Sequence, residues 1–351
     1  GGIGYLLGPL TGATLASGAI GAQISNAIFA SITAYIQLIG GAILILLVLQ
    51  NQDGLAREQI NQFNFIAAKL RSLIPALPQA KQEVFELPPA TPVAERRKVQ
   101  AQTLVVEGLT VTYGGVTAVN DLSLTVEPGR IVGLIGPNGA GKTSAIDAIT
   151  GFTKTTMGSV HLDGKDLSAG SAIARARAGL SRSFQTLELF EDATVLDNLR
   201  AASDPRDRRS YLIDLIHPAA PPLPAPVVDA IREFQLQDDL LRLVQDLPYG
   251  QRRLLAIARA VATQPGVLLL DEPAAGLGDR ETAELAHLVR RLADDWGIAV
   301  LLVEHDMNFV MSTCDHIVVL DFGRQISEGP PDVVRQDPHV IAAYLGEHEE
   351  E

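Results

Sequence analysis

The sequence predicts an α/β domain with a mostly parallel sheet from about residue 103 onward, preceded by a hydrophobic segment. Three observations support this prediction. Beyond Thr103, short β-rich runs alternate with helical stretches. Residues 131–135 and 267–270 are continuous apolar runs, which are typical of strands buried on both faces of a sheet. A glycine-rich run, residues 136–144, follows the first of these strands and opens a predicted helix.

The N-terminal segment has the composition of membrane-embedded chain. No charged side chain occurs before Asp53, although charged residues make up 20% of the sequence. Residues 28–49 form an apolar run that, as a helix, is long enough to cross a bilayer core of ~30 Å. Residues 3–24 are also apolar but contain several glycines and Pro9, which predicts a second, broken or re-entrant membrane helix. One buried core helix is the alternative interpretation.

Residues 53–102 are predicted to connect this segment, residues 1–52, to the α/β domain. Residues 55–74 have an approximate helical stripe of apolar side chains, and several prolines then describe an extended linker. We place the domain boundary near Gln102. Since the first methionine is Met157, Gly1 is expected not to be the natural start of the protein.

Charge and cysteine content exclude two classes of function. The net charge of −13 disfavours a nucleic-acid partner, because phosphate neutralisation requires clustered Lys and Arg. The single cysteine, Cys314, allows neither a disulfide framework nor a cysteine-based metal site. The α/β domain is expected to lie in a reducing cytosol.

Within that domain, two helices and one irregular segment are predicted. The first helix covers residues 141–150 and is stopped by Gly151. The second covers residues 280–296, with one apolar face that includes Trp296 as a core residue. Six prolines between residues 203 and 226 predict a surface excursion.

The glycine-rich run predicts a phosphate-binding loop. Its glycines let successive backbone N–H groups converge on phosphate oxygens, and the following helix N-terminus adds favourable partial charge. Lys142 is expected to reach the β and γ phosphates of ATP, and the Thr143 hydroxyl to ligate a magnesium ion, Mg²⁺. An ordinary glycine-rich turn is the alternative. The predicted nucleotide-binding residues of the loop are Gly136, Pro137, Asn138, Gly139, Ala140, Gly141, Lys142, Thr143 and Ser144.

Two carboxylates end the predicted strand at residues 267–270. Ligands of open α/β sheets bind at the carboxyl ends of strands, where Asp271 and Glu272 stand. Asp271 is expected to hold Mg²⁺, and Glu272 to orient or deprotonate the attacking water. A strand end with solvated acids is the alternative.

In this order the motifs resemble the ATP-binding cassette (ABC) family over residues 103–346. The resemblance implies a P-loop NTPase fold, a mixed sheet core with a helical subdomain at about residues 181–262, in a domain spanning residues 103–348. It also implies roles for five further segments. Tyr113 would stack on adenine, and Gln185 would contact Mg²⁺ and the membrane subunit and take a catalytic part. A signature segment, residues 247–251, would bind nucleotide through Tyr249, Gly250 and Gln251. Residues 275–279 would form a dimer-interface loop, and His305 would contact the γ phosphate with a catalytic part.

Two positions depart from the family's pattern. Pro248 stands where the signature usually has serine, so the segment must rely on backbone N–H groups, chiefly at Gly250. Gly278 stands in the interface loop where Asp or Asn is common. The acidic residue Asp279 therefore comes one position later than the family's pattern has it. Both changes bear on ATP-driven dimerisation.

Finer likeness points to ATPases of branched-chain amino-acid importers, through residues 181–190, 247–251 and 303–346. The segment from residue 1 resembles the closing part of the permease in those systems, so the chain looks like a permease tail fused to its ATPase. The implied partners are a second, identical or different, ABC ATPase domain, permease membrane domains and an extracytoplasmic substrate-binding protein. The implied place is the inner membrane, with the ATPase on its cytoplasmic face. A soluble regulatory ABC protein is the main alternative, and an exporter is disfavoured.

Overall fold

The computed structural model describes residues 87–88, 99–203 and 223–345. The chain divides into two units, residues 1–86 and 87–351, of which only the second contains described residues. The predicted membrane segments, the helical stripe and nearly all of the proline-rich linker lie outside them. No helix in the described ranges is both long and apolar enough to span a bilayer.

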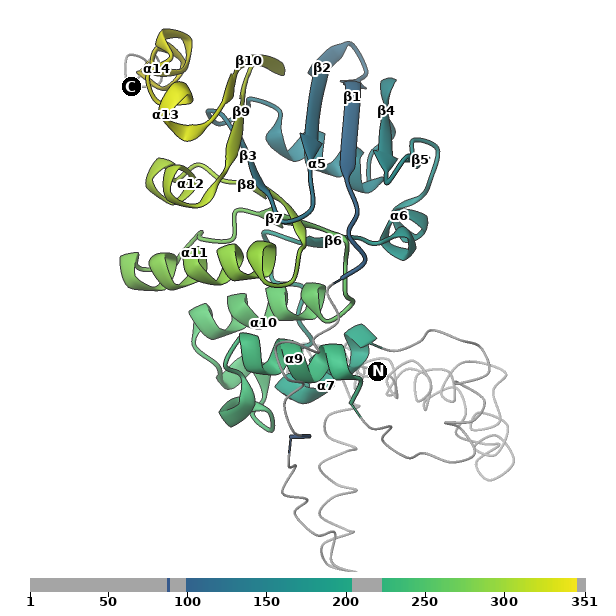
Figure 1. Ribbon diagram of the computed structural model, residues 1–351, viewed down its shortest axis with the longest axis vertical. Coiled ribbons are helices and arrows are strands. Elements are labelled where there is room, and N and C mark those ends of the chain that lie inside the picture. The colour runs from purple at the N-terminus through teal and green to yellow at the C-terminus, as the bar shows by residue number, and fades with distance from the viewer. Residues whose placement is uncertain (1–86, 89–98, 204–222, 346–351) are drawn as a thin grey trace, which may run out of the picture. The chain divides into compact units, whose positions relative to one another are not determined.

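The domain is built on a ten-stranded sheet (Figure 1). Its strand order is β5-β4-β1-β2-β10-β9-β3-β8-β7-β6. The strands are β1 (Leu104–Tyr113), β2 (Val116–Val126), β3 (Ile131–Ile135), β4 (Met157–Leu162), β5 (Lys165–Asp166), β6 (Leu180–Ser183), β7 (Val267–Asp271), β8 (Ala299–Val303), β9 (His316–Asp321) and β10 (Arg324–Gly329).

The sheet is mixed, as the family resemblance implies: five of its nine strand pairings are parallel, so the prediction of a mostly parallel sheet describes only the part around β3. Strands β9, β3, β8, β7 and β6 run parallel, and their apolar sequences fit burial on both faces. Strands β5, β4, β1 and β2 are antiparallel neighbours instead. In these strands buried and exposed side chains alternate in part, which is the pattern of a sheet with one solvated face.

Helices cover the sheet and extend beyond its β6 edge (Figure 1). They are α5 (Lys142–Thr150), α6 (Ala172–Ala178), α7 (Val195–Ser203), α9 (Ala225–Glu233), α10 (Tyr249–Val261), α11 (Asp279–Asp294), α12 (Met307–Thr313), α13 (Pro331–Val334) and α14 (Pro338–Leu345), with short 3₁₀ turns η2 (Gln237–Asp239) and η3 (Val244–Asp246).

The predicted helices agree with α5 and α11 within two residues. Gly151 stops α5 in the left-handed conformation, as expected. Helix α11 ends at Asp294, earlier than predicted, because the chain turns at Gly297, whose φ is +74°. Trp296 still packs in the core, at 8% exposure. The buried apolar face therefore extends two residues beyond the end of the helix.

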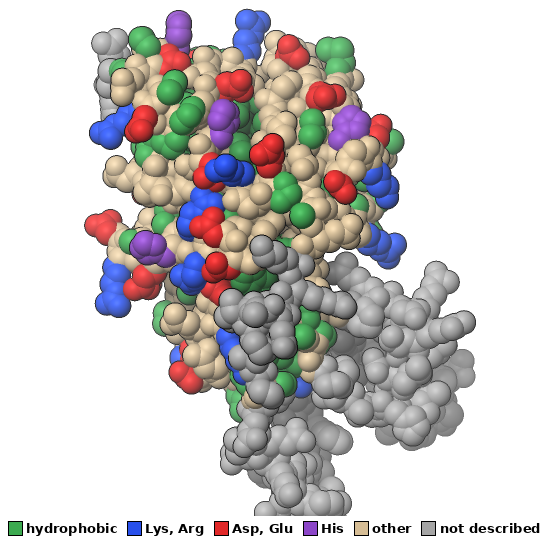
Figure 2. All heavy atoms as spheres, in the orientation of Figure 1, with side chains coloured by type: hydrophobic (Ala, Val, Ile, Leu, Met, Phe, Trp, Pro, Cys, Tyr) green, Lys and Arg blue, Asp and Glu red, His purple; other side chains and the backbone are tan. Residues whose placement is uncertain are grey.

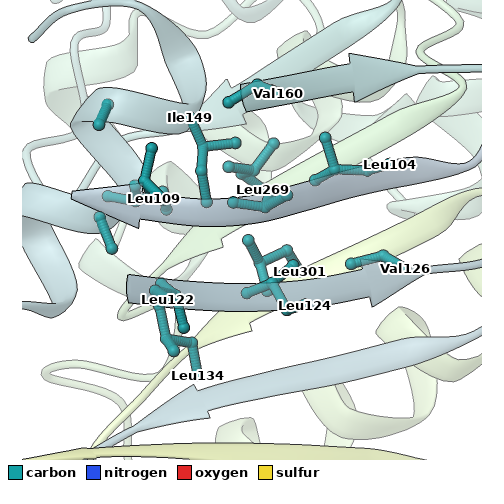
Figure 3. Close-up of a cluster of buried hydrophobic side chains, with 14 of the residues drawn as sticks. Leu104, Leu109, Leu122, Leu124, Val126, Leu134, Ile149, Val160, Leu269 and Leu301 are labelled. Carbon is teal, nitrogen blue, oxygen red and sulfur yellow. The ribbon is translucent and has the colours of Figure 1, made fainter. Parts of the chain in front are cut away.

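A large apolar cluster between the two parts of the sheet and α5 holds the domain together (Figure 3). It draws side chains from nine elements, β1, β2, β3, β4, α5, β6, β7, β8 and β9. Members at 0% exposure include Leu109, Leu122, Leu134, Ile149 and Leu269. Fully burying one such side chain stabilises a fold by about 1.5–3 kcal/mol, so the cluster fixes α5 firmly on the sheet.

The region between β6 and β7 is mostly helical. Helix α10 packs against α7, α9, β6 and β7. Residues 181–183, which the resemblance assigned to a helical subdomain, form part of β6 in the sheet. Of the predicted surface excursion, residues 204–222 lie outside the described ranges, whereas Leu223 is buried and α9 starts at Ala225.

Residues 99–102, assigned to the linker, pack on the domain. Val99 is buried, and its N–H donates to the Trp296 carbonyl over 3.3 Å. The Gln102 amide donates to the Ala178 carbonyl over 3.0 Å. The compact domain thus begins before Thr103.

Candidate functional site

The phosphate-binding loop connects β3 to α5, and its backbone requires glycine at two points. A Cβ on Gly136 would lie 2.1 Å from the Leu320 carbonyl oxygen, and one on Gly141 would lie 2.3 Å from that of Ala118. Both residues also have positive φ, as does Gly139 at +81°. The tight fit holds the loop against β9 and β2 while Asn138 and Gly139 stay exposed at its tip.

Helix α5 begins without a side-chain cap and without an acid in its first turn. The amides at a helix start carry partial positive charge, which is suited to a bound anion. Thr143 is exposed there and Ser144 is half-buried, whereas Pro137 and Ala140 are buried in the loop. The Lys142 ammonium, on a 7% exposed residue, donates to the Gly136 and Pro137 carbonyls over 2.7 and 2.9 Å. Loop, lysine and helix end therefore form one cationic cradle.

Asp271 ends β7 and is almost fully buried. Arg182, on the neighbouring strand β6, donates to Asp271 Oδ2 over 2.6 Å and to Asp147 Oδ1 over 2.5 Å. The Arg182 guanidinium also lies against the Phe184 ring, 4.7 Å from its centroid. One buried cation thereby joins the end of β7, helix α5 and the segment after β6.

Glu272 and Gln185, far apart in sequence, lie side by side. The Gln185 amide nitrogen donates to Glu272 Oε2 over 2.8 Å. The Glu272 N–H donates to the Val303 carbonyl over 2.9 Å, and its φ of +46° is in the left-handed region that side chains disfavour. The structure thus brings the two predicted residues together at the edge where β7 and β8 end.

Arg253 of α10 stabilises this edge of the sheet through hydrogen bonds to backbone carbonyls. It is completely buried, and its guanidinium donates to the carbonyls of Gln185 over 2.8 Å and Pro273 over 3.0 Å. It also donates to the Glu272 and Phe184 carbonyls. One side chain therefore links the backbone at residues 184–185 to the backbone at residues 272–273.

The predicted Mg²⁺ ligands form a chemically suitable set. Thr143, Gln185 and Asp271 offer hydroxyl, amide and carboxylate oxygens, the hard donors that Mg²⁺ prefers. The Gln185 amide nitrogen is engaged by Glu272, which leaves its carbonyl oxygen as the donor atom. Arg182 occupies Asp271 Oδ2, which leaves Oδ1 outside that ion pair. A bound Mg²⁺ would supply charge neutralisation at phosphate oxygens.

The signature segment opens α10, with Pro248 at the N-cap. The Tyr249 hydroxyl donates to the Ala275 carbonyl over 3.3 Å, and the Gln251 amide donates to Asp239 Oδ2 over 3.1 Å. Within the subunit, Tyr249 thus contacts the 275–279 loop, while Gln251 is fixed to η2.

His305 follows β8 and has a largely exposed side chain. Its neighbour Glu304 is fully buried and accepts the N–H groups of Ala274 over 2.7 Å and His305 over 3.1 Å. Burial raises the pKa of the Glu304 carboxyl, and these backbone donors oppose that effect. Glu304 therefore ties the segment carrying His305 to the start of the 275–279 loop.

Tyr113 lies at the end of β1, with its ring 48% exposed. Its hydroxyl is within 3.3 Å of Thr153 Oγ1, just beyond α5. An exposed ring anchored beside the phosphate-loop helix suits stacking on a planar base.

Comparison with known proteins places this arrangement in a family. Residues 119–275 match the family described as "ABC transporter", and residues 324–350 match "Branched-chain amino acid ATP-binding cassette transporter". The branched-chain amino acid transport ATP-binding protein BraF of Pseudomonas aeruginosa is 41% identical over 249 residues, which cover 70% of this chain and 98% of that protein. The chain belongs to the ABC transporter ATP-binding family.

Other ABC proteins are also similar to this chain. LivG of Escherichia coli K12, with a similarly worded name, is 39% identical over the same shares of the two chains. The lipopolysaccharide export system ATP-binding protein LptB of that organism is 34% identical over 245 residues, 70% of this chain and 98% of its own. Among solved structures, the ADP conformation of MJ1267, an ATP-binding cassette of an ABC transporter, superposes with a TM-score of 0.62 at 28% identity, covering 70% of this chain and 99% of that one.

Three residues of this ABC domain were not assigned roles from the sequence. Arg182 lies inside the recognised segment 181–190 and Arg253 follows the signature segment by two residues, yet nothing in their spacing predicts that they are buried and bridge other motifs. Glu304 directly precedes His305, and a charged residue after the apolar run of β8 was the one available signal. Their functions depend on contacts between segments that are distant in sequence.

Proposed function

We propose that this chain binds and hydrolyses Mg²⁺-ATP to power an ABC importer. The observation on which this proposal depends is the meeting of Gln185 and Glu272 beside the buried Asp271, on the same sheet edge as the loop carrying Lys142. Lys142 and the α5 amides hold the β and γ phosphates, and Tyr113 stacks on adenine. Glu272 orients the attacking water or accepts its proton, and Gln185 and His305 help to position that water.

Hydrolysis in this proposal requires two ABC domains. Each phosphate loop faces the Tyr249–Gln251 segment of the other domain, whose α10 N-terminus offers amides to the γ phosphate. ATP binding closes the pair and hydrolysis reopens it, a two-state change biased by nucleotide. The partner domain is a second copy or a related subunit.

The proposed cargo is a branched-chain or related amino acid. Support comes from BraF and LivG and from the match over residues 324–350, a segment outside the ATP-binding motifs. LptB is less similar to the chain, so lipopolysaccharide export is the weaker candidate. An extracytoplasmic binding protein is the proposed source of cargo.

A groove beside Gln185 is suited to a membrane partner. It has a volume of about 800 Å³ and lies between β6, α6, α7 and α10. Its lining includes Phe152 and Phe190, which are 59% and 52% exposed, and Phe184 meets Phe152 edge to face. Exposed aromatic side chains are typical of protein interfaces. We assign the groove to a cytoplasmic loop of the permease domains.

The N-terminal 52 residues fit the same proposal as a fused permease tail. Fusion keeps the ATPase on the cytoplasmic face of the inner membrane at high effective concentration near its permease.

The surface charge is consistent with a partner other than nucleic acid. On the face shown in Figure 2, basic side chains lie among acidic ones and do not form the continuous stripe that nucleic acid requires.

The test is ATP-dependent uptake of radiolabelled leucine, isoleucine or valine into liposomes that contain the full-length chain and its partner subunits. Uptake should disappear in the matched Lys142→Ala preparation. ATP hydrolysis without uptake of any of these substrates would refute the cargo, whereas recovery of the intact chain in the soluble fraction would favour the regulatory alternative.

A further inference from the structure

An acidic side chain of α11 lies over the signature glycine. A Cβ built on Gly250 would lie 2.4 Å from Glu281 Oε1, so the Glu281 carboxylate occupies the space where any side chain at position 250 would go. The other oxygen, Oε2, accepts the Gly278 N–H over 3.1 Å. Glu281 itself is exposed, so its charge faces the surface beside Gly250.

Two other contacts make this arrangement rigid. The Tyr249 hydroxyl donates to the Ala275 carbonyl, and a Cβ on Gly276 would come within 3.0 Å of the Tyr249 ring. The start of α10 and the 275–279 loop therefore pack as one surface. Glu281 lies at the centre of it, held by Gly278 on one side and by close packing on Gly250 on the other.

Helix α10 brings no negative charge of its own to its start. Its N-cap is Pro248, which offers no side-chain acceptor, and its first turn contains no acid. The unpaired amides there give the helix end partial positive charge. Glu281, reaching across from α11, is the acid that packs directly on Gly250, whereas Asp239 of η2 accepts the side-chain amide of Gln251.

We propose that Glu281 weakens ATP-driven closure by placing a negative charge where the γ phosphate of the opposite domain docks. The inference rests on the proposed two-domain function, in which the segment around Gly250 receives that phosphate. Like charges brought together at an interface disfavour the complex. Glu281 thus acts as a specificity-determining residue: the repulsion acts most strongly on a triphosphate and sets the ATP concentration at which the domains close.

A substitution can separate the effect of the Glu281 charge from the effect of its side-chain shape. Glu281→Gln keeps an oxygen that accepts the Gly278 N–H and nearly the same volume over Gly250, but removes the negative charge. Glu284→Gln is the matched control, because Glu284 lies on the same helix, three residues further on, and pairs with Arg280 over 2.9 Å.

The experiment measures closure in the assembled full-length complex carrying Glu272→Gln, so that turnover does not reopen it. Spin labels on the two ABC domains report the ATP concentration that gives half-maximal closure. Glu281→Gln should lower that concentration about tenfold, and Glu284→Gln should change it less than about twofold. Raising the salt concentration should shrink the Glu281→Gln effect, since salt screens exposed charges.

The outcomes are distinguishable. If Glu281→Gln needs as much ATP as its parent, or more, or if its effect is the same at high salt, the proposed repulsion is wrong and Glu281 only shapes the loop. If the parent complex does not close with ATP at all, the two-domain function itself is wrong.

Discussion

Arg182 donates to Asp271 across two adjacent strands of the sheet, at 2.6 Å and with both side chains under a tenth exposed. The same guanidinium holds Asp147 of α5 at 2.5 Å. The proposed Mg²⁺ ligand is therefore fixed by a cation whose own position depends on the phosphate-loop helix. The phosphate-loop helix and the acidic end of β7 are far apart in sequence, and Arg182 joins them into one structural unit.

Arg182→Ala should destabilise the domain by about 3 kcal/mol, because removing one partner leaves a buried carboxylate unpaired. Arg182→Lys should recover a part of the loss, since a single ammonium lacks the fork that reaches both acids. Urea unfolding measures both. As a control, Arg242→Ala breaks an exposed pair with Asp239 and should cost under about 1 kcal/mol. Equal losses at the two sites would contradict the bridging role.

Lys142→Ala should abolish ATP retention or turnover, because the β and γ phosphates lose their main counter-charge. Binding of a fluorescent ATP analogue and phosphate release measure the two effects. Lys165→Ala, at an exposed position on β5, is the matched control and should behave as wild type. Normal ATPase rates in Lys142→Ala would refute the assignment of this loop as the nucleotide site.

Glu272→Gln should bind ATP but turn it over slowly, and closed dimers should accumulate. The amide keeps the shape and the neighbour Gln185 but cannot accept a proton from water. Size-exclusion chromatography with ATP, combined with a turnover assay, measures both properties. A variant that stays open with ATP and hydrolyses it at the normal rate would show that Glu272 has another role.

Asp315→Asn should destabilise the domain at neutral pH by about 1.5–3 kcal/mol, as for hydrogen bonds to a charged group. Burial opposes ionisation of Asp315, but bonds from the Ile131 N–H at 2.8 Å and from Arg290 at 2.9 Å outweigh it and lower the pKa. A lowered folded-state pKa stabilises above the unfolded value of ~3.9, and this stabilisation is lost as pH falls through the folded value.

The measurement for Asp315 is urea unfolding from pH 7 down to pH 2.5. The gap between wild type and Asp315→Asn should be widest near neutrality, begin to shrink below about pH 4, where the unfolded chain takes up the proton, and close as pH falls through the lowered folded-state pKa. The exposed Asp192→Asn should show no such convergence. A gap that is constant with pH would mean that the substitution acts through packing alone.

Local patterns predicted the parts of the domain that depend on local physics. The glycines at 136 and 141, the apolar runs of β3 and β7 and the helix stop at Gly151 each follow from the needs of their own backbone. The strand-edge rule pointed to the two acids at the end of β7, and the family resemblance assigned Gln185 to Mg²⁺; the contact between Gln185 and Glu272 is added by the structure.

Long-range packing was not predictable in the same way. The antiparallel pairing of β1, β2 and β4 depends on which apolar faces meet, and the runs themselves do not encode it. The burial of Arg253 required its carbonyl partners at Gln185, Glu272 and Pro273, which come from two other segments. A charged residue in an amphipathic helix is otherwise expected to face solvent.

The left-handed backbone of Glu272 has a consequence for engineering this chain. A non-glycine residue held in that conformation costs about 1–2 kcal/mol, so the domain tolerates a local penalty at the very residue proposed to act on water. A library that varied position 272 and was selected for heat resistance alone would converge on glycine or asparagine. Such a screen would enrich sturdier and inert proteins, which means that hydrolysis has to be part of any selection applied here.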